Sequence, residues 1–318
     1  MAAQLPRIAV IGAGGMLGTA MIDHLVGRHQ VFAAGRSPGL AVPGVTWHAF
    51  DLLDHSALAG WIQAVRPDAV VHCAALVNVD ACEKNVTGAR ALHAGTTAVI
   101  ADEIAKRPAR LVYISTDSVF DGRKSGPYLE DDHTAPPNVY ATTKLEGEAV
   151  ALAASGVVLR TNIFGWSRAE RISFAEWVLK GLVERAPLTM FRDVLYTPIH
   201  VTHLAEVTAD VIAQDVSGLF HATGSTVLSK YDFALRLAAA FNLSHAHIRS
   251  ISVDDAGLSA NRPKNMALAN HRLQSALNRA LPGVDEGIAL FKRQHDNGKL
   301  AKIKSRPVKS NGRFWEIA

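Results

Sequence analysis

The sequence predicts an α/β fold in which a doubly wound parallel sheet is followed by a smaller C-terminal α/β domain. Short β-branched runs alternate with helix-like stretches through the first half of the 318 residues. These runs are apolar throughout, as expected for strands of a parallel sheet that helices cover on both faces. After about residue 166 the rhythm loosens, and amphipathic helices surround short strand candidates.

The elements of the first half follow one another in the order of a wound sheet. Strands are expected at residues 7–12, 30–35, 69–75, 110–115 and 156–165, and helices at 16–27 and 87–107. In the second half, helices are expected at 173–184 and 231–241, with a strand at 218–224. We therefore assign residues 1–165 to a first domain, to which the chain returns near 190–225. Residues 166–318 mainly form the second domain.

Composition and charge restrict the class of protein. With 48% hydrophobic and 19% charged residues, the chain is expected to be globular with a substantial core. No apolar run reaches membrane-spanning length, and the start lacks an apolar segment behind a basic one, so we expect a soluble, cytoplasmic protein that binds no membrane. Two cysteines are too few for a disulfide framework, and no carboxylate cluster suggests a metal site.

The positive charge is concentrated at the C-terminus. The net charge is +4, and from Lys292 onward there are eight Lys or Arg against two Asp or Glu. Because the positive charge belongs to this basic C-terminal tail, we do not expect the protein to bind nucleic acid. We interpret the tail as a solvated, partly mobile segment; the alternative is a tail that attracts phosphates or binds a partner.

The stretch GAGGMLG, residues 12–18, follows the first predicted strand. Its glycines fit a Gly-x-x-Gly-x-x-Gly register at Gly12, Gly15 and Gly18, whereas the last position of the Gly-x-Gly-x-x-Gly register is Leu17. Glycines permit a tight turn and close approach of the backbone to a pyrophosphate, and the next helix offers its N-terminal N–H groups to the phosphates. The residues of this turn that we expect to bind a dinucleotide are Gly12, Gly14, Gly15, Met16, Leu17 and Gly18.

Residues after the next strands indicate which dinucleotide is bound. An NAD site usually has an acid at the end of the second strand, but this chain has AAGRS, with Arg36. A guanidinium can pair with a 2′-phosphate, which favours NADPH over NADH; the alternative is that Arg36 stacks on the adenine. Asp51 follows a strand and could accept a hydrogen bond from the adenine amine, while Asp54 suits a helix cap. The remaining expected cofactor contacts are Leu52, Ala74 and Ala75.

The stretch NVYATTKLEGE, residues 138–148, places a tyrosine four positions before a lysine. On a helix, Tyr140 and Lys144 lie about one turn apart on the same face, so an ammonium could lie beside a phenol. A single pair with this spacing is a weak motif. Its meaning depends on the motifs around it.

Six motifs stand in order along the chain: GAGGMLG, DLLD, HCAA, VDACE, ISTDSVFDG and YATTK. In this order they resemble the extended short-chain dehydrogenases/reductases, above all the dTDP-4-dehydrorhamnose reductase group of sugar-nucleotide ketoreductases. The resemblance runs almost end to end, because LRTNIFGW, YTPIHVTHLA, GLFHATG and RPKNMAL are similar to later segments of the group. It implies a Rossmann-type domain that binds NADP and a smaller domain that closes over a nucleotide sugar.

The resemblance also implies a reaction. Tyr140 is the general acid, Lys144 is its partner and binds the nicotinamide ribose, and Thr116 supplies a further hydroxyl. A free tyrosine has a pKa near 10, and a fixed ammonium and the oxidised nicotinamide both favour the phenolate. Hydride passes to a sugar ketone carbon, expected at C4, while Tyr140 donates a proton to the developing alkoxide and Thr116 hydrogen-bonds it.

Three departures from the group's pattern leave the substrate open. His93 stands where many relatives have an asparagine that holds a water in a proton relay, which leaves open whether His93 alters the relay. Ser118 replaces an aromatic residue, and RTNIFG is one residue shorter than a tryptophan-containing form. The residues expected to contact a nucleotide sugar are Thr116, Ser118, Val119, Tyr140, Asn162, Trp166 and Arg262. For Arg262, a guanidinium suits a diphosphate, but an ordinary surface arginine before a proline is the alternative.

The same fold also serves dehydratases, epimerases and non-catalytic subunits, which are the alternatives to a reductase. Dehydratases of this fold need an acid pair after the threonine, and here Ser118 follows Asp117, which disfavours elimination. An epimerase could use Thr116, Tyr140 and Lys144 equally well. A non-catalytic NADP-binding subunit, like the regulatory subunit of methionine adenosyltransferase, is disfavoured because these three residues are intact. The sequence leaves open the base, the sugar, the stereochemistry and whether the protein is a homodimer.

Overall fold

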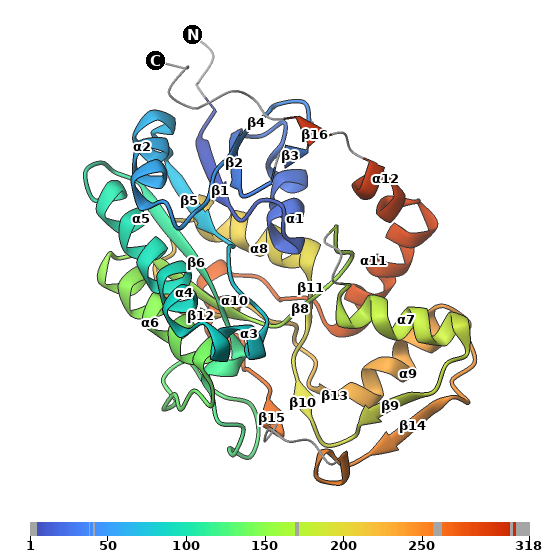
Figure 1. Cartoon of the computed structure of the whole chain (residues 1–318). Helices are drawn as coiled ribbons and strands as arrows, with labels where there is room; N and C mark the ends of the chain where they lie inside the picture. The colour runs from blue at the N-terminus through green and yellow to red at the C-terminus, as the bar shows by residue number, and fades with distance from the viewer. Residues whose placement is uncertain are drawn as a thin grey trace.

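The computed structural model describes residues 5–37, 39–40, 42–168, 172–256, 263–305 and 308–309. Its centre is a seven-stranded sheet in the order β12-β7-β6-β5-β1-β2-β4, and every neighbouring pair is parallel (Figure 1). The strands are β1 Arg7–Ile11, β2 Gln30–Gly35, β4 Val45–Ala49, β5 Ala69–His72, β6 Arg110–Thr116, β7 Val157–Thr161 and β12 Gly218–His221. The chain builds outward from β1 in one direction and then in the other, which confirms the predicted doubly wound fold.

The apolar strands are buried on both faces. Successive side chains of a strand point to opposite sides of the sheet. In β1, Ile8 and Val10 pack into one core, while Ala9 and Ile11 pack into another on the opposite face. This explains why the strands lack the polar alternation of a half-exposed sheet.

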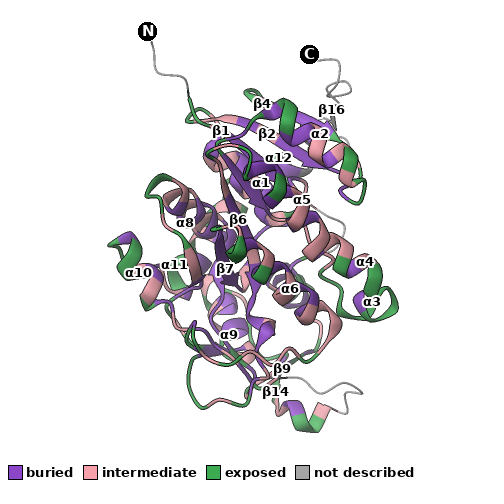
Figure 2. Ribbon diagram, turned by 90° about the vertical axis from the view of Figure 1, so that its left-hand side faces the viewer, coloured by how far each residue is buried: buried purple, intermediate pink, exposed green. Residues whose placement is uncertain are grey.

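Helices cover both faces of the sheet. One core contains residues of α1 Met16–Leu25, α8 Val201–Ala213 and α10 His271–Leu277, and the other contains residues of α2 His55–Val65, α5 Thr96–Ile104 and α6 Val139–Ala153. Figure 2 shows the strands buried between helices whose outer faces are exposed. Between β5 and α5 lie α3 Val79–Lys84, α4 Val86–Arg90 and a π-helical turn, Ala91–Gly95. In the part of the chain that the structure describes, no helix is long and apolar enough to cross a membrane.

The second domain has its own core. Its elements are α7 Phe174–Glu184, β9 Leu188–Phe191, β10 Leu195–Tyr196, β13 Leu228–Ser229, α9 Lys230–Ala240, β14 Ile248–Ile251, β15 Asn265–Met266, α11 Val284–Asp296 and α12 Lys299–Ser305. Strand β9 pairs with β14 in parallel, and β10 lies between β13 and β15. Two short pairs complete the fold: β8 Ile163–Phe164 with β11 Ile199–His200, and β3 Gly39–Leu40 with β16 Val308–Lys309.

From Lys292 to Ser305 the basic segment is mostly helical and not a mobile tail, although its charged side chains between 292 and 302 are exposed or partly exposed, as expected for a solvated segment. Residues 292–296 complete α11, whose Ile288 and Phe291 are buried in the core of the second domain. Helix α12 buries Ile303 in the same core, and Lys299 forms an ion pair with Asp23 of α1. Apolar residues at helical spacing, rather than the basic charge, decide the structure of this segment. Residues 310–318 lie outside the described part.

Candidate active site

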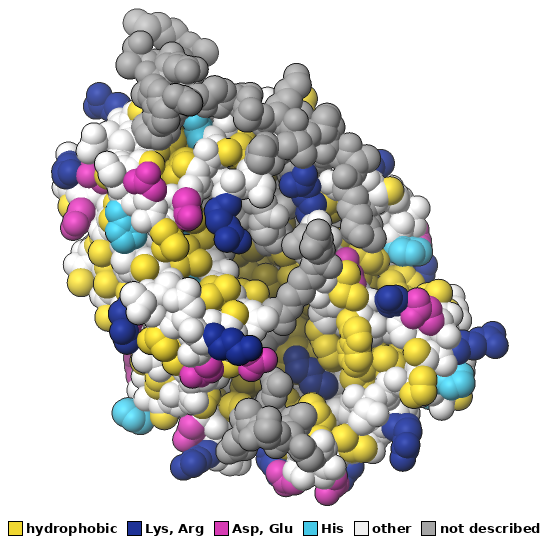
Figure 3. Space-filling view, viewed as in Figure 1, with side chains coloured by type: hydrophobic (Ala, Val, Ile, Leu, Met, Phe, Trp, Pro, Cys, Tyr) yellow, Lys and Arg dark blue, Asp and Glu magenta, His cyan; other side chains and the backbone are white. Residues whose placement is uncertain are grey.

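The predicted cofactor and catalytic residues meet at one edge of the sheet. The glycine turn follows β1, Arg36 follows β2, Ala74 and Ala75 follow β5, and Thr116 ends β6. Carboxyl ends of neighbouring parallel strands lie together, and ligands of wound α/β sheets bind there. Figure 3 shows a hollow on this side of the molecule between the sheet and the second domain, lined largely by hydrophobic side chains.

Two glycines of the turn are needed for packing. Gly12 has a φ of +78°, and a Cβ on it would lie 2.6 Å from the backbone nitrogen of Ala74. A Cβ on Gly18 would lie 2.4 Å from the carbonyl oxygen of Gly12. Both positions therefore require glycine for the close contact of β1, α1 and the β5 loop.

The other two glycines leave the start of α1 open. A Cβ on Gly14 would approach no atom closer than 4.0 Å, and one on Gly15 would lie 3.3 Å from the Gly12 oxygen. Gly15 is the N-cap of α1, and no side chain caps this helix. The first-turn N–H groups, beginning at Met16 and Leu17, can therefore bind an anion such as a pyrophosphate.

The residues expected around the adenosine lie at the same edge. Arg36 is exposed directly after β2. Asp51 is exposed after β4, and its Oδ1 accepts a hydrogen bond from Leu53 N at 3.0 Å. Leu52 is buried, so its side chain contributes to the core of the domain. Asp54 caps α2 by accepting a hydrogen bond from Ala57 N at 2.9 Å, as expected for that position.

A residue that supports this edge was missed in the sequence. The Trp47 ring of β4 lies 3.3 Å from the position of a Cβ on Gly35 and 4.0 Å from one on Gly14. Its Nε1 donates to the Ser37 carbonyl at 3.1 Å. Trp47 thus joins the glycine turn to the segment that carries Arg36. A lone tryptophan in a strand gave no signal of this contact.

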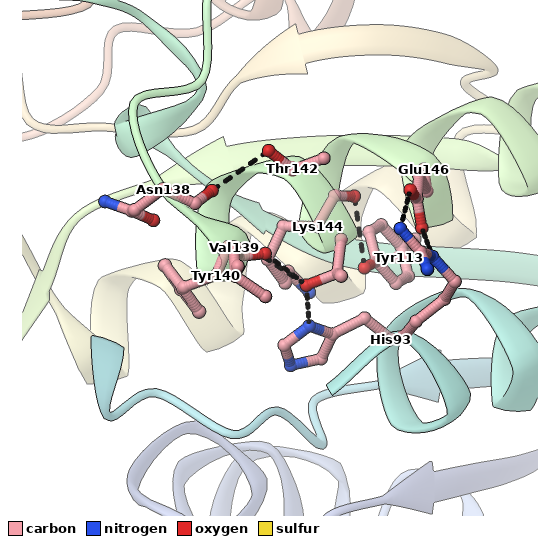
Figure 4. A network of polar contacts seen from close by, with 10 residues as sticks. His93, Tyr113, Asn138, Val139, Tyr140, Thr142, Lys144 and Glu146 are labelled. Atoms are coloured by element: carbon pink, nitrogen blue, oxygen red, sulfur yellow. Dashed lines mark hydrogen bonds and ion pairs between the residues drawn. The ribbon is translucent and has the colours of Figure 1, made fainter. Parts of the chain in front are cut away.

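The two residues of the Tyr-x-x-x-Lys motif lie on the first turns of α6 (Figure 4). Asn138 starts this helix, because its side chain accepts a hydrogen bond from Ala141 N at 2.9 Å. Tyr140 therefore sits in the first turn and Lys144 one turn later, with Thr116 at the end of the strand that α6 packs against.

Lys144 is almost fully buried, at 2% exposure. Its Nζ donates to the Ile114 carbonyl at 2.6 Å and lies 3.9 Å from the centre of the Tyr113 ring. Burial lowers the pKa of Lys144 to about 7, although Glu148 opposes this effect. The Ile114 carbonyl and the Tyr113 ring thus fix the position of the Lys144 amino group.

Tyr140 is half-buried beside Thr116. Burial raises the pKa of Tyr140 to about 12, and a hydrogen bond with Thr116 opposes this rise. Desolvation thus dominates the pKa of Tyr140, and the Lys144 ammonium is held by the Ile114 carbonyl. The effect of this lysine and a bound nicotinamide on the phenolate stays a prediction. The phenol keeps its proton at neutral pH and can donate it.

His93 connects the π-helical turn to α6, and Figure 4 shows its ring pointing toward that helix. Its Nε2 accepts a hydrogen bond from Leu76 N at 2.9 Å, and its Nδ1 lies 2.8 Å from Thr143 Oγ1. The Thr143 hydroxyl donates to the Val139 carbonyl at 2.8 Å, so Nδ1 is the donor to Thr143. Burial lowers the pKa of His93 to about 3. Both ring nitrogens thus have hydrogen-bond partners, and His93 links the segment after β5 to α6.

The residues expected to bind substrate differ in their surroundings. The Ser118 hydroxyl and the Asn162 amide both donate to Asp117, at 3.2 and 2.5 Å. Val119 is fully buried with Phe120, so its side chain cannot line the hollow. Trp166 stacks on Phe291 at 3.9 Å between ring centres and is only 6% exposed, which places it in the core of the second domain. Arg262 lies outside the described residues.

Two further residues of the site were not singled out from the sequence. Tyr196 of β10 and Lys230 of α9 lie close enough to Asp117 for its charge to affect the pKa of both. A lysine on the first turn of a helix is unfavourable because of the helix dipole, and this could have drawn attention to Lys230. Within the described ranges, no group of His, Cys, Asp or Glu side chains could hold a metal ion.

Comparisons with known proteins agree with this architecture. Residues 6–295 match the RmlD substrate binding domain family. The chain is 32% identical over 287 residues to methionine adenosyltransferase 2 subunit beta of Rattus norvegicus, covering 85% of this chain and 82% of that protein. It is 29% identical over 293 residues to dTDP-4-dehydrorhamnose reductase of Burkholderia thailandensis, covering 87% and 94%.

A solved structure extends the comparison to the fold. The crystal structure of dTDP-4-dehydrorhamnose reductase from Bacillus anthracis in complex with NADP superposes with a TM-score of 0.79 at 24% identity. The superposition covers 92% of this chain and 100% of that one. The chain therefore belongs to the RmlD substrate binding domain family of dTDP-4-dehydrorhamnose reductase-like extended short-chain dehydrogenases/reductases, a family of NAD(P)-dependent sugar-nucleotide reductases.

Proposed function

We propose that the protein uses NADPH to reduce a keto group, at C4, of a nucleotide-activated deoxysugar. The observation that carries this proposal is that Thr116, Tyr140 and Lys144 lie at the same edge of the sheet as the open N-terminus of α1. One edge of the sheet thus offers a site for a dinucleotide and a protonated phenol. Family membership supports the same reaction class.

The residues fit the proposed cofactor. The uncapped first turn of α1 would bind the pyrophosphate, and Arg36 would pair with the 2′-phosphate. Asp51 would contact the adenine, and Lys144 the nicotinamide ribose. When bound, NADPH supplies the hydride. The Bacillus anthracis reductase with NADP has the same fold, which is consistent with this assignment.

Proton transfer falls to Tyr140 and Thr116. Because the phenol keeps its proton at neutral pH, Tyr140 can donate it to the alkoxide that forms at the ketone oxygen. Thr116 Oγ1 would hydrogen-bond the same oxygen and favour the developing charge. The buried Lys144 ammonium would stabilise the phenolate left behind.

The test is to mix the protein with NADPH and a panel of 4-keto nucleotide sugars, including dTDP-4-dehydrorhamnose. We expect the absorbance of the reduced nicotinamide to fall in proportion to the sugar consumed. An epimerase would change the sugar's configuration without net consumption of NADPH. Either that result or no reaction with the whole panel would contradict the proposal.

A second candidate function is that of a non-catalytic subunit. It is favoured by the 32% identity to methionine adenosyltransferase 2 subunit beta, compared with 29% to the Burkholderia reductase. The chain would then bind a methionine adenosyltransferase and serve as its partner. Stable co-purification with such an enzyme, together with no reductase activity on any nucleotide sugar, would favour this function.

A further inference from the structure

A charged side chain of the second domain reaches the proposed active site. Lys230 is the first residue of α9, and its Nζ lies 3.3 Å from the centre of the Tyr196 ring and 4.7 Å from that of Phe174. Among the described residues, no carboxylate or carbonyl oxygen accepts a hydrogen bond from this ammonium. The two rings hold the cation by their faces and leave its N–H donors for another group.

Lys230 is coupled to the catalytic residues through Asp117. Asp117 is 2% exposed, and its Oδ1 accepts a hydrogen bond from Thr116 Oγ1 at 3.1 Å. Its Oδ2 accepts one from Asn162 at 2.5 Å. Burial lowers the pKa of Lys230 to about 8, while the Asp117 carboxylate opposes the decrease. At neutral pH Lys230 therefore remains mostly an ammonium, and the carboxylate balances its charge.

The position of Lys230 at the start of α9 is unfavourable for the stability of the helix. A cation on the first turn of a helix interacts unfavourably with the helix dipole. Close by, the Tyr196 hydroxyl is buried without a hydrogen-bond partner among the described residues. A cation at an unfavourable helix position and a hydroxyl without a partner thus lie together near Asp117, and such local violations are expected at functional sites.

We propose that Lys230 is a specificity-determining residue that donates a hydrogen bond to the sugar hydroxyl on the carbon next to the ketone. The inference rests on the proposed function and adds the recognition of the substrate to it. Because Asp117 compensates the charge of Lys230, the pair suits a neutral hydroxyl oxygen better than a carboxylate. A sugar without this hydroxyl leaves a buried ammonium without its acceptor, and such sites discriminate strongly.

The experiment compares two sugars and two lysines. The ratio of kcat/KM for dTDP-4-dehydrorhamnose and its C3-deoxy analogue should be about 10 to 100 in the wild type. Lys230→Met should bring this ratio close to one, mainly by raising KM for the hydroxylated sugar, and should leave NADPH affinity unchanged. Lys292→Met is the matched control: its Nζ lies 5.6 Å from the Phe241 ring centre, outside the site, so the ratio should stay at the wild-type value.

The outcomes of this experiment distinguish a role of Lys230 in substrate specificity from a purely structural role. Equal losses for both sugars, or an unchanged ratio, would overturn the inference. If Lys230→Met fails to fold, Lys230→Leu, which keeps an apolar side chain against Tyr196 and has no hydrogen-bond donor, replaces it with the same expected loss of discrimination.

The proposed reaction can fail independently of this inference. If neither sugar is reduced, both are titrated calorimetrically into the NADP⁺-loaded protein. A binding preference that Lys230→Met abolishes would support the inference while refuting the reaction. Absence of binding by either sugar would refute both.

Discussion

Lys144→Met replaces a buried ammonium with an apolar side chain of similar length. Lys144 is 2% exposed, and burial lowers its pKa to about 7. In the unfolded chain the lysine has its ordinary pKa near 10.5. Between these two values the unfolded state binds more protons than the folded state, so the free energy of unfolding rises with pH and falls as pH decreases toward 7.

The linkage relation gives the size of this effect. Between pH 7 and pH 9, Lys144 alone should raise the wild-type free energy of unfolding by about 2 kcal/mol. Lys144→Met lacks this contribution, so its stability should depend correspondingly less on pH. The variant also loses the hydrogen bond to Ile114 O, which costs about 1–3 kcal/mol for a buried carbonyl and offsets part of the gain from removing a buried charge.

Urea unfolding followed by circular dichroism at pH 7 and pH 9 measures the effect. The control is Lys180→Met, which removes a lysine whose side chain is 64% exposed and should keep the wild-type pH dependence. The reasoning is refuted if Lys144→Met and the wild type gain the same stability between the two pH values. Turnover and cofactor affinity should both fall in Lys144→Met, since the proposed role of Lys144 is to bind the ribose and tune Tyr140.

Three further predictions concern the cofactor and the proton. Tyr140→Phe removes only a hydroxyl, so it should keep NADPH affinity while lowering kcat by about 10²- to 10⁴-fold; a wild-type rate would mean that another group donates the proton. Arg36→Ala should weaken NADPH binding selectively, by about 1–3 kcal/mol in a fluorescence titration, and an equal loss for NADH would remove the 2′-phosphate role. Gly18→Ala places a Cβ 2.4 Å from the Gly12 oxygen and should lower stability in urea by about 1–3 kcal/mol, whereas Gly14→Ala, with no atom closer than 4.0 Å, should not; equal stability of both variants would contradict the packing argument.

The fold could be predicted because its signals are local. The apolar strand runs and the glycine turn at residues 12–18 specify a covered parallel sheet and its first crossover, and both were confirmed. The position of Tyr140 and Lys144 on one helix also followed from spacing alone. The basic charge near the C-terminus gives no sign that α11 and α12 pack against the second domain; the apolar residues Ile288, Phe291 and Ile303 decide that packing.

The surroundings of the site could not be predicted because they depend on contacts between distant segments. Trp166 comes after strand β8 and Gly165, where the strand pattern has ended, so nothing local decides that it stacks on Phe291 instead of lining the hollow. Val119 lies on a single 3₁₀ turn, Asp117–Val119, in which successive side chains point about 120° apart, so the sequence does not show which of them faces the hollow. Lys230 meets Asp117 across more than a hundred residues of sequence, and only the packing of the second domain brings the two together.

The central claim is hydride transfer to a sugar ketone, and the most direct test follows the transferred atom. The protein is incubated with a 4-keto nucleotide sugar and NADPH in which both hydrogens at C4 of the nicotinamide are deuterium, and the product is analysed by mass spectrometry and NMR. The account predicts one deuterium on the reduced sugar carbon for each NADPH oxidised, with a strong loss of product in Tyr140→Phe. A nucleotide sugar recovered unreduced and unlabelled, with the NADPH intact, would contradict it.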